Sequence, residues 1–306
     1  MAWRLRLAGL ARLAMPALAG ALLAGVAVVH AQAQAVQTAQ TVQVPSLEAP
    51  GGTAVVLPGF WFVAAGATPA PAMVLLHGCG GAFDGRGRVV ARYTELAARL
   101  NALGIHVLVT DSFTPRGETE LCTQRVGQRR VTQLQRRRDA LGTLQWLAAQ
   151  PGVDRQRLGL LGWSNGGSTV LAALNRRHPE VVAAPVQPSL AVAFYPGCEA
   201  ELQRGFEPTA PLLMLLAELD DWTPASPCKA LSHGAMTSPT GPAVQWESYA
   251  DAYHGFDGTA PLRLRRDVPG GVHPGQGVHV GAEPAARAAA ALRLEEFLQD
   301  TWSLKR

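Results

Sequence analysis

The sequence predicts an α/β protein with a mostly parallel central sheet and helices on both faces. Short runs that are apolar throughout alternate with longer amphipathic stretches along most of the chain. Strands without polar alternation are buried on both faces, which is typical of a parallel sheet covered by helices. Hydrophobic residues make up 48% of the 306 residues and charged residues 16%, so the chain can bury a large core and is not disordered as a whole.

The predicted strands lie between turn-forming residues and cover residues 73–77, 105–111, 158–162, 190–195, 212–217 and 244–249. The predicted helices cover residues 89–103, 131–149, 165–177 and 285–302. Gly104 and Pro151 follow the first two helices, and both residue types commonly end a helix. Residues 258–284 are rich in Gly, Pro and His. Their apolar residues follow neither the helical nor the strand period, so they are assigned to no element.

The N-terminal residues have the order of a secretory signal peptide. Three arginines within residues 1–12 precede an apolar run over residues 13–29, and small residues suited to cleavage follow at Ala31 and Ala33. An apolar run of about 17 residues approaches the length that spans a membrane, so an uncleaved anchor is the alternative.

This order divides the chain into three parts. We expect a signal peptide over residues 1–33, a flexible mature N-terminus over residues 34–52 and a single α/β domain over residues 53–306. No second long apolar run follows, so we expect no membrane contact beyond the signal segment. The expected location is the periplasm or the outside of the cell.

The charge of the chain argues against nucleic-acid binding. The formal net charge is +4, but three of the 27 basic residues lie in the expected signal peptide, which leaves 24 against 23 acidic residues. A nucleic-acid-binding protein would keep a strongly basic face. Two short clusters, Arg129–Arg130 and Arg136–Arg138, are predicted to be the solvated side of a helix.

Four cysteines, an even number, predict two disulfides in an exported protein. Of the three possible pairings we favour Cys79–Cys122 and Cys198–Cys228, because each pair would join neighbouring loops at the same ends of successive strands. A reactive thiol at Cys79 is the alternative.

The motif Gly162-Trp163-Ser164-Asn165-Gly166 marks a candidate nucleophile. Such a G-x-S-x-G match is weak evidence by itself, because an ordinary glycine-rich turn with a serine helix cap has the same letters. Here a predicted buried strand precedes the motif and a predicted helix follows it. A sharp strand-to-helix turn of this kind exposes a serine hydroxyl for attack, so Ser164 is the predicted nucleophile.

A second glycine-rich turn, His77-Gly78-Cys79-Gly80-Gly81, follows an earlier strand. An oxyanion hole needs two N–H donors directed at the developing negative charge. We expect these donors to be the backbone amides of Cys79 and of Asn165, the residue after the nucleophile. A plain tight turn is the alternative for this stretch.

An acid and a base follow Ser164 in the order expected of one hydrolase class. Asp220 comes directly after a predicted strand and is the favoured acid, with Asp221 second and Glu218 third. His254 follows the last predicted strand and is the favoured base. His273 and His279 could compete for that role, or could form a metal site with His254, but the sequence has no H-E-x-x-H motif.

Three aromatic residues lie next to these positions in the sequence. Trp163 precedes Ser164, Trp222 follows the candidate acids, and Phe256 follows His254. They are candidate substrate-binding residues, and packing in the core is an equally good interpretation.

The chain resembles the dienelactone hydrolase family of the α/β-hydrolase superfamily. Six stretches carry the resemblance, in the family's order: HGCGG from His77, DSFTPRG from Asp111, GWSNGG from Gly162, AFYPGC from Ala193, LLAELDDWTP from Leu215 and AYHGFD from Ala252. The resemblance implies an α/β-hydrolase fold with Ser164 as nucleophile, Asp220 as acid and His254 as base. The founding members of the family are cytoplasmic and use Cys as nucleophile, so this chain is most similar to an exported serine-type branch.

Together these observations predict a serine hydrolase that cleaves carboxylic esters through an acyl-enzyme, with lactones left open as a further substrate. The expected partner is a small-molecule ester, and neither a metal nor an organic cofactor is required. A peptidase or acyltransferase with the same three residues is an alternative within the enzymes. A binding protein with a hydrolase fold but no catalysis is the alternative outside them.

Overall fold

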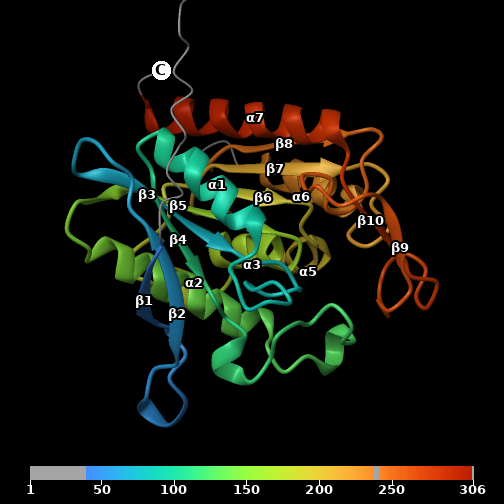
Figure 1. The fold of residues 1–306 in the computed structure, drawn as a ribbon, viewed down its shortest axis with the longest axis horizontal. Coiled ribbons are helices and arrows are strands. Elements are labelled where there is room, and N and C mark those ends of the chain that lie inside the picture. The colour runs from blue at the N-terminus through green and yellow to red at the C-terminus, as the bar shows by residue number, and fades with distance from the viewer. Residues whose placement is uncertain (1–38, 237–240, 305–306) are drawn as a thin grey trace, which may run out of the picture. The chain divides into compact units, whose positions relative to one another are not determined.

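The computed structural model describes residues 39–236 and 241–304, and its centre is an eight-stranded sheet (Figure 1). The strand order is β1-β2-β4-β3-β5-β6-β7-β8. From β4 to β8 all neighbours are parallel, whereas β2 is antiparallel to β4 and β1 is antiparallel to β2. The prediction of a mostly parallel sheet is confirmed. The strands are β1 (Gln40–Pro45), β2 (Val56–Phe62), β3 (Ala70–Leu76), β4 (His106–Thr110), β5 (Val153–Trp163), β6 (Leu190–Phe194), β7 (Leu212–Ala217) and β8 (Val244–Tyr249).

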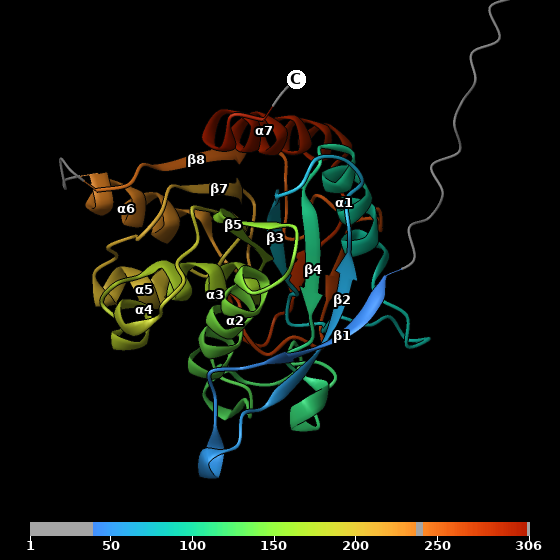
Figure 2. The same ribbon diagram turned by 90° about the vertical axis from the view of Figure 1, so that its left-hand side faces the viewer.

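Helices cover both faces of this sheet, as expected (Figure 2). Helices α1 and α7 pack on one face, where Leu294 and Leu298 of α7 are buried against the strands. Helices α2, α3 and α6 pack on the other face. The helices are α1 (Ala91–Ala102), α2 (Gln133–Ala148), α3 (Asn165–Leu174), α4 (Pro179–Ala183), α5 (Glu199–Arg204), α6 (Ala225–Met236) and α7 (Pro284–Trp302).

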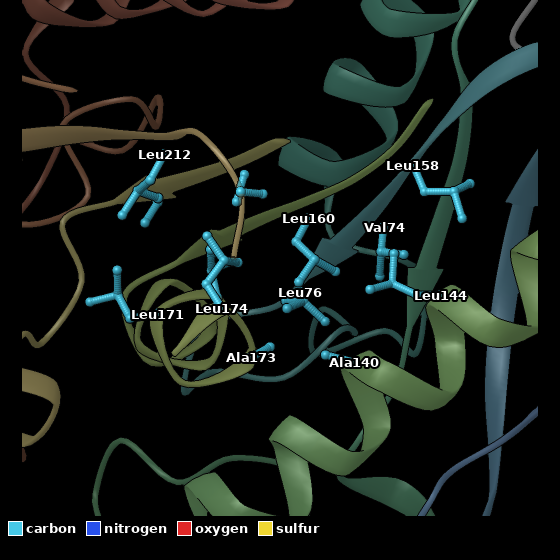
Figure 3. Close-up of a cluster of buried hydrophobic side chains, with 14 of the residues drawn as sticks. Val74, Leu76, Ala140, Leu144, Leu158, Leu160, Leu171, Ala173, Leu174 and Leu212 are labelled. Atoms are coloured by element: carbon cyan, nitrogen blue, oxygen red, sulfur yellow. The ribbon is translucent and has the colours of Figure 1, made fainter. Parts of the chain in front are cut away.

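The core below α2 and α3 is built from side chains of alternate strand positions. Figure 3 shows Leu76 of β3 and Leu160 of β5 near Leu144 of α2 and Leu174 of α3. All four side chains are almost completely buried. Because both faces of the central strands are buried in this way, their sequences have no polar alternation.

The N-terminal part of the described chain differs from the expectation of a flexible segment over residues 34–52. Residues 40–45 form the edge strand β1, paired with β2 from Gln40–Trp61 to Pro45–Val56. Val44 is fully buried beneath α2, and the alternation of Thr, Val and Gln in this strand provides the inward-facing positions. The expected signal peptide lies outside the described residues. Within residues 39–236 and 241–304, no helix is long and apolar enough to cross a membrane.

Residues 258–284 contain two short strands that were not predicted. Strands β9 (Arg263–Arg265) and β10 (Val278–Val280) pair antiparallel as a separate two-stranded sheet. Three residues per strand are too few for a periodic pattern to be recognised in a sequence. The segment is attached to the main domain by the hydrogen bond from Gly281 N to His254 O (3.0 Å).

Two of the three arginines at residues 136–138 do not lie on a solvated side of a helix, contrary to expectation. Arg136 and Arg137 of α2 are only 1% and 6% exposed. Arg137 pairs with Glu180 of α4 at 3.2 Å. Arg136 points to the end of β3 instead, where its Nη2 donates to His77 O at 2.8 Å.

Two disulfides lie near the carboxyl ends of the strands. Cys79 is bonded to Cys122 and Cys198 to Cys228, which is the pairing that the sequence favoured. The first bond joins the turn after β3 to the long loop after β4. Two disulfides are typical of proteins that work in oxidising compartments, and with both sulfurs of the first pair bonded, Cys79 carries no reactive thiol.

The contact between α2 and the chain after β1 leads to a prediction about two helical glycines. A Cβ at Gly142 of α2 would lie 2.5 Å from Pro45 O and 3.0 Å from Leu47 N, which are backbone atoms that cannot rotate away. A Cβ at Gly234 of α6 would meet no atom within 4 Å. We expect Gly142→Ala to lower the free energy of unfolding by about 1–3 kcal/mol.

The matched variant Gly234→Ala should raise the free energy of unfolding by about 0.5–1 kcal/mol, because alanine is the better helix former. Urea unfolding of both variants measures the difference. Equal effects of the two substitutions would contradict the tight contact at Gly142.

Candidate active site

Ser164 lies in a strained turn between β5 and α3. Its backbone has φ 53° and ψ −118°, a conformation that residues other than glycine rarely adopt. A Cβ at Gly162 would lie 2.3 Å from Gly166 O, and a Cβ at Gly166 would lie 2.1 Å from Leu76 O. Only glycine therefore fits at either side of Ser164, which is the steric reason for the G-x-S-x-G pattern.

A continuous chain of hydrogen bonds joins Ser164, His254 and Asp220. The Ser164 Oγ lies 2.9 Å from His254 Nε2, and His254 Nδ1 lies 2.8 Å from Asp220 Oδ2. The three residues are 8%, 3% and 4% exposed, so water competes little for these bonds. Since a carboxylate only accepts, His254 Nδ1 carries the proton toward Asp220, and Nε2 is left to accept from the Ser164 hydroxyl.

The Asp220 carboxylate is fixed by the loop that follows it. Its Oδ1 accepts hydrogen bonds from the backbone amides of Trp222 and Thr223, both at 2.9 Å. The Thr223 hydroxyl lies 3.1 Å from Oδ2 and 3.0 Å from Tyr195 O. These contacts leave Oδ2 directed at His254 and give the imidazole one orientation.

Asp221, the second candidate acid, has a different histidine partner. Its Oδ2 lies 2.7 Å from His279 Nδ1, and its Oδ1 accepts from the His279 amide at 2.8 Å. His254 and His279 are thus held by different carboxylates. Glu218, the third candidate, pairs with Lys229. In the part of the chain that the structure describes, no group of three metal-binding side chains is present.

The turns after β3 and β5 bring the expected oxyanion donors to the same edge of the sheet. Leu76 and Gly162 are the last residues paired between β3 and β5, and Cys79 and Asn165 each follow three residues later. Among the described residues, neither the Cys79 amide nor the Asn165 amide has a hydrogen-bond acceptor. The Cys79 loop is held by its disulfide and by the bond from Leu121 N to Cys79 O (2.7 Å).

The three aromatic candidates lie in different surroundings. Phe256 is fully buried and packs against Tyr195 and Tyr249. Trp163 is 2% exposed, and its Nε1 donates to Asp257 Oδ2 at 2.7 Å. Both rings therefore form part of the core.

Trp222 differs from the other two because it is partly exposed and contacts His254, with ring centroids 4.7 Å apart. Its ring also packs against the cluster around the Cys79–Cys122 disulfide. Trp222 thus borders both the His254 ring and this cluster, and it remains the candidate for substrate contact.

Sequence reasoning missed a polar network behind His254. The Asp257 carboxylate accepts from Tyr195 Oη at 2.6 Å and pairs with Arg92 at 3.4 Å. The Tyr195 ring lies 4.6 Å from the His254 ring, and burial raises the pKa of its hydroxyl well above the ordinary value. Tyr195 and Asp257 fall within the AFYPGC and AYHGFD stretches, which was the one available signal.

The mostly parallel sheet, with a serine at the strained turn after β5 and a histidine and an aspartate hydrogen-bonded to it in series, defines an α/β-hydrolase. The chain belongs to the dienelactone hydrolase family, which matches it over residues 57–301. Because a dienelactone is a cyclic ester, this family membership makes the chain a carboxylic ester hydrolase. No curated protein matches the chain.

Several solved structures share the fold. A Klebsiella pneumoniae protein named after dienelactone hydrolase is 17% identical, with a TM-score of 0.61 over 85% of this chain and 97% of its own. The propionate-bound esterase of Thermogutta terrifontis is 16% identical, with a TM-score of 0.60 over 89% of this chain and 97% of its own. The same esterase phosphoramylated by tabun gives a TM-score of 0.58 at 16% identity and the same coverage.

His77, which precedes the oxyanion turn, leads to a prediction about pH. Its ring is completely buried, with Nε2 accepting from Ser112 N at 3.1 Å and Nδ1 lying 2.9 Å from Gly78 O. Burial, together with the nearby Arg136 charge, lowers the His77 pKa well below its ordinary value. Below about pH 6.5 the unfolded chain binds a proton at His77 that the folded chain does not bind, so stability falls as the pH falls.

We expect His77→Gln to flatten the decline in the free energy of unfolding between about pH 7 and pH 5. The matched variant His273→Gln, at an exposed position, should leave that decline unchanged. Urea unfolding at a series of pH values measures both slopes. An unaltered slope in His77→Gln would contradict a buried neutral imidazole.

Proposed function

We propose that this protein is a serine esterase that forms an acyl-enzyme at Ser164, with His254 as general base and Asp220 as the acid that orients it. The observation that carries the proposal is the continuous hydrogen-bonded chain from Ser164 Oγ through the His254 ring to Asp220 Oδ2. Three separate loops contribute to it, after β5, β7 and β8, so their convergence at hydrogen-bonding distance needs the whole fold.

The first half of the reaction is attack on the ester carbonyl. His254 Nε2 takes the hydroxyl proton as Ser164 Oγ bonds to the carbonyl carbon, and Asp220 stabilises the imidazolium. The carbonyl oxygen becomes an oxyanion that accepts from the amides of Cys79 and Asn165. When the tetrahedral intermediate collapses, His254 returns the proton to the departing alkoxide, and the alcohol leaves.

The second half repeats these roles with water. His254 Nε2 removes a proton from a water molecule as the water oxygen attacks the acyl carbon, and a second oxyanion forms between the same two amides. The intermediate then releases the carboxylic acid, and the proton on His254 returns to Ser164 Oγ. Every group in this cycle comes from the chain itself, so the scheme uses no metal or organic cofactor.

For the substrate we propose small-molecule carboxylic esters and lactones, with the Trp222 ring along one side of the reacting group. Two observations support this: Trp222 contacts His254, and it is the partly exposed member of the three aromatic candidates. The Thermogutta terrifontis esterase, which shares the fold, has been solved with bound propionate and with bound butyrate. These ligands support short acyl groups as substrates.

We also propose that the protein acts in the periplasm or is secreted, after removal of residues 1–33. Both disulfides support a location outside the cytoplasm, because thiols in the cytosol are kept reduced. The basic, apolar and small-residue order of the N-terminal sequence supports an export signal.

The nucleophile is tested by Ser164→Ala. We expect this variant to lose hydrolysis of a p-nitrophenyl ester by about 10⁴-fold or more, because no other group replaces the attacking oxygen. The wild type should bind a fluorophosphonate probe covalently at Ser164, found by mass spectrometry of the labelled peptide. Ester hydrolysis that survives in Ser164→Ala, with an intact circular dichroism spectrum, would disprove the assignment.

The acid is tested by a matched pair of neighbouring substitutions. Asp220→Asn should lower kcat about a thousandfold or more, because an amide can donate to His254 Nδ1 and so favour the wrong tautomer. Asp221→Asn should keep kcat within about tenfold of the wild type, because its partner His279 makes no contact with Ser164. The reverse ranking of the two variants would show that Asp221 is the acid.

A further inference from the structure

Arg136 is a buried cation that the scheme above does not use. It is the fourth residue of α2 and is only 1% exposed. Its two terminal nitrogens donate in different directions: Nη1 to the side-chain oxygen of Asn165, and Nη2 to the backbone oxygen of His77 at 2.8 Å. The guanidinium also lies over the Phe113 ring, 5.2 Å from its centroid.

These two acceptors belong to the two turns that carry the expected oxyanion donors. Asn165 supplies one donor with its own amide, and His77 lies two residues before Cys79, which supplies the other. A single planar group therefore spans both turns. Gln133, one turn earlier on α2, reinforces the contact by donating from Nε2 to Asn165 O at 3.1 Å.

The charge of Arg136 has no ion-pair partner among the described residues. The carboxylates of Asp139 and Asp111 act on Arg136 electrostatically without forming an ion pair with it. Asp139 is bound by Arg116 and by Ser46, and Asp111 accepts from the amide of Phe113. The Nε of Arg136 is buried and has no hydrogen-bond partner.

An unpaired buried charge is costly to a folded protein. Burial lowers the Arg136 pKa to about 10, so the guanidinium is still protonated at neutral pH. Its position adds to the cost, because the first turns of α2 and α3 both carry partial positive charge. The buried charge of Arg136 destabilises the resting protein. It has a function if an anion forms near it during the reaction.

We propose that Arg136 is a positioning residue for the oxyanion hole: its guanidinium holds the Asn165 and His77 turns together, and its unpaired charge stabilises the oxyanion of the tetrahedral intermediate. Arg136 itself contacts neither the substrate nor the reacting atoms. The inference rests on the proposed serine mechanism and adds to it a charge that the backbone amides alone do not supply.

The test compares Arg136→Gln, which removes the charge, with Arg136→Lys, which keeps it. Arg137→Gln is the matched control, because Arg137 is its neighbour on α2 and is also buried, but pairs with Glu180. For each protein we would measure the melting temperature, kcat and KM with a p-nitrophenyl ester, and Ki for a trifluoromethyl ketone. The serine adduct of this ketone is tetrahedral and carries the oxyanion.

We expect Arg136→Gln to lower kcat about tenfold to hundredfold with KM within about threefold of the wild type. Ki for the ketone should rise by about the same factor as kcat falls, since both report the oxyanion. The fall in kcat and the rise in Ki should be clearly smaller for Arg136→Lys than for Arg136→Gln. Arg137→Gln should match the wild type in kcat and Ki. A purely structural role would lower the melting temperature without this parallel change in kcat and Ki.

Three results would overturn the inference: a kcat for Arg136→Gln within about twofold of the wild type, equal losses in Arg136→Gln and Arg136→Lys, or a Ki that stays constant while kcat falls. If Arg136→Gln does not fold, Arg136→Lys is the deciding variant. A fall in its kcat of more than about a hundredfold, with a melting temperature equal to that of the wild type, rejects the role of the charge. Failure of the proposed serine mechanism is recognised separately, because the wild type would then neither hydrolyse the ester nor bind the ketone.

Discussion

The candidate site depends on one close contact, in which the bare backbone of Gly166 rests against the carbonyl end of β3. A methyl group at Gly166 would lie 2.1 Å from Leu76 O and 2.6 Å from His77 O, so any side chain there would push the turns after β3 and β5 apart. With them in contact, the amides of Cys79 and Asn165 lie at the same edge of the sheet as Ser164. The strained backbone of Ser164 persists because this packing surrounds it.

The sequence was informative wherever a functional residue directly follows a buried strand. The apolar runs ending before His77, Gly162 and Glu218 are β3, β5 and β7, and parallel pairing brings their carboxyl ends together. Order along the chain was therefore enough to name the serine, acid and histidine candidates. Order along the chain could not separate Asp220 from Asp221. The local backbone geometry decides which of two neighbouring side chains points to His254, and the sequence carries no signal for that geometry.

Other features were beyond the sequence because they depend on contacts between distant segments. Arg136 belongs to a run of three arginines, which is typical of the solvated face of a helix. In the structure its guanidinium contacts Asn165, His77 and Phe113 instead. Residues 258–284 show neither a helical nor a strand period, but they are hydrogen-bonded to the chain beside the candidate site. His279 N donates to Asp221, and Gly281 N donates to His254 O, so one irregular segment supports both the loop of the acid and the loop of the histidine.

The bond between Cys79 and Cys122 determines when, after synthesis of the chain, the turn at Cys79 becomes covalently fixed. It closes a loop between residues 43 positions apart, and one of its ends is the residue whose amide is expected to receive the oxyanion. A newly made chain with free thiols lacks this covalent tie, so its anion-receiving turn is less firmly held. The candidate site would then reach its final form only under oxidising conditions, in which this disulfide can form.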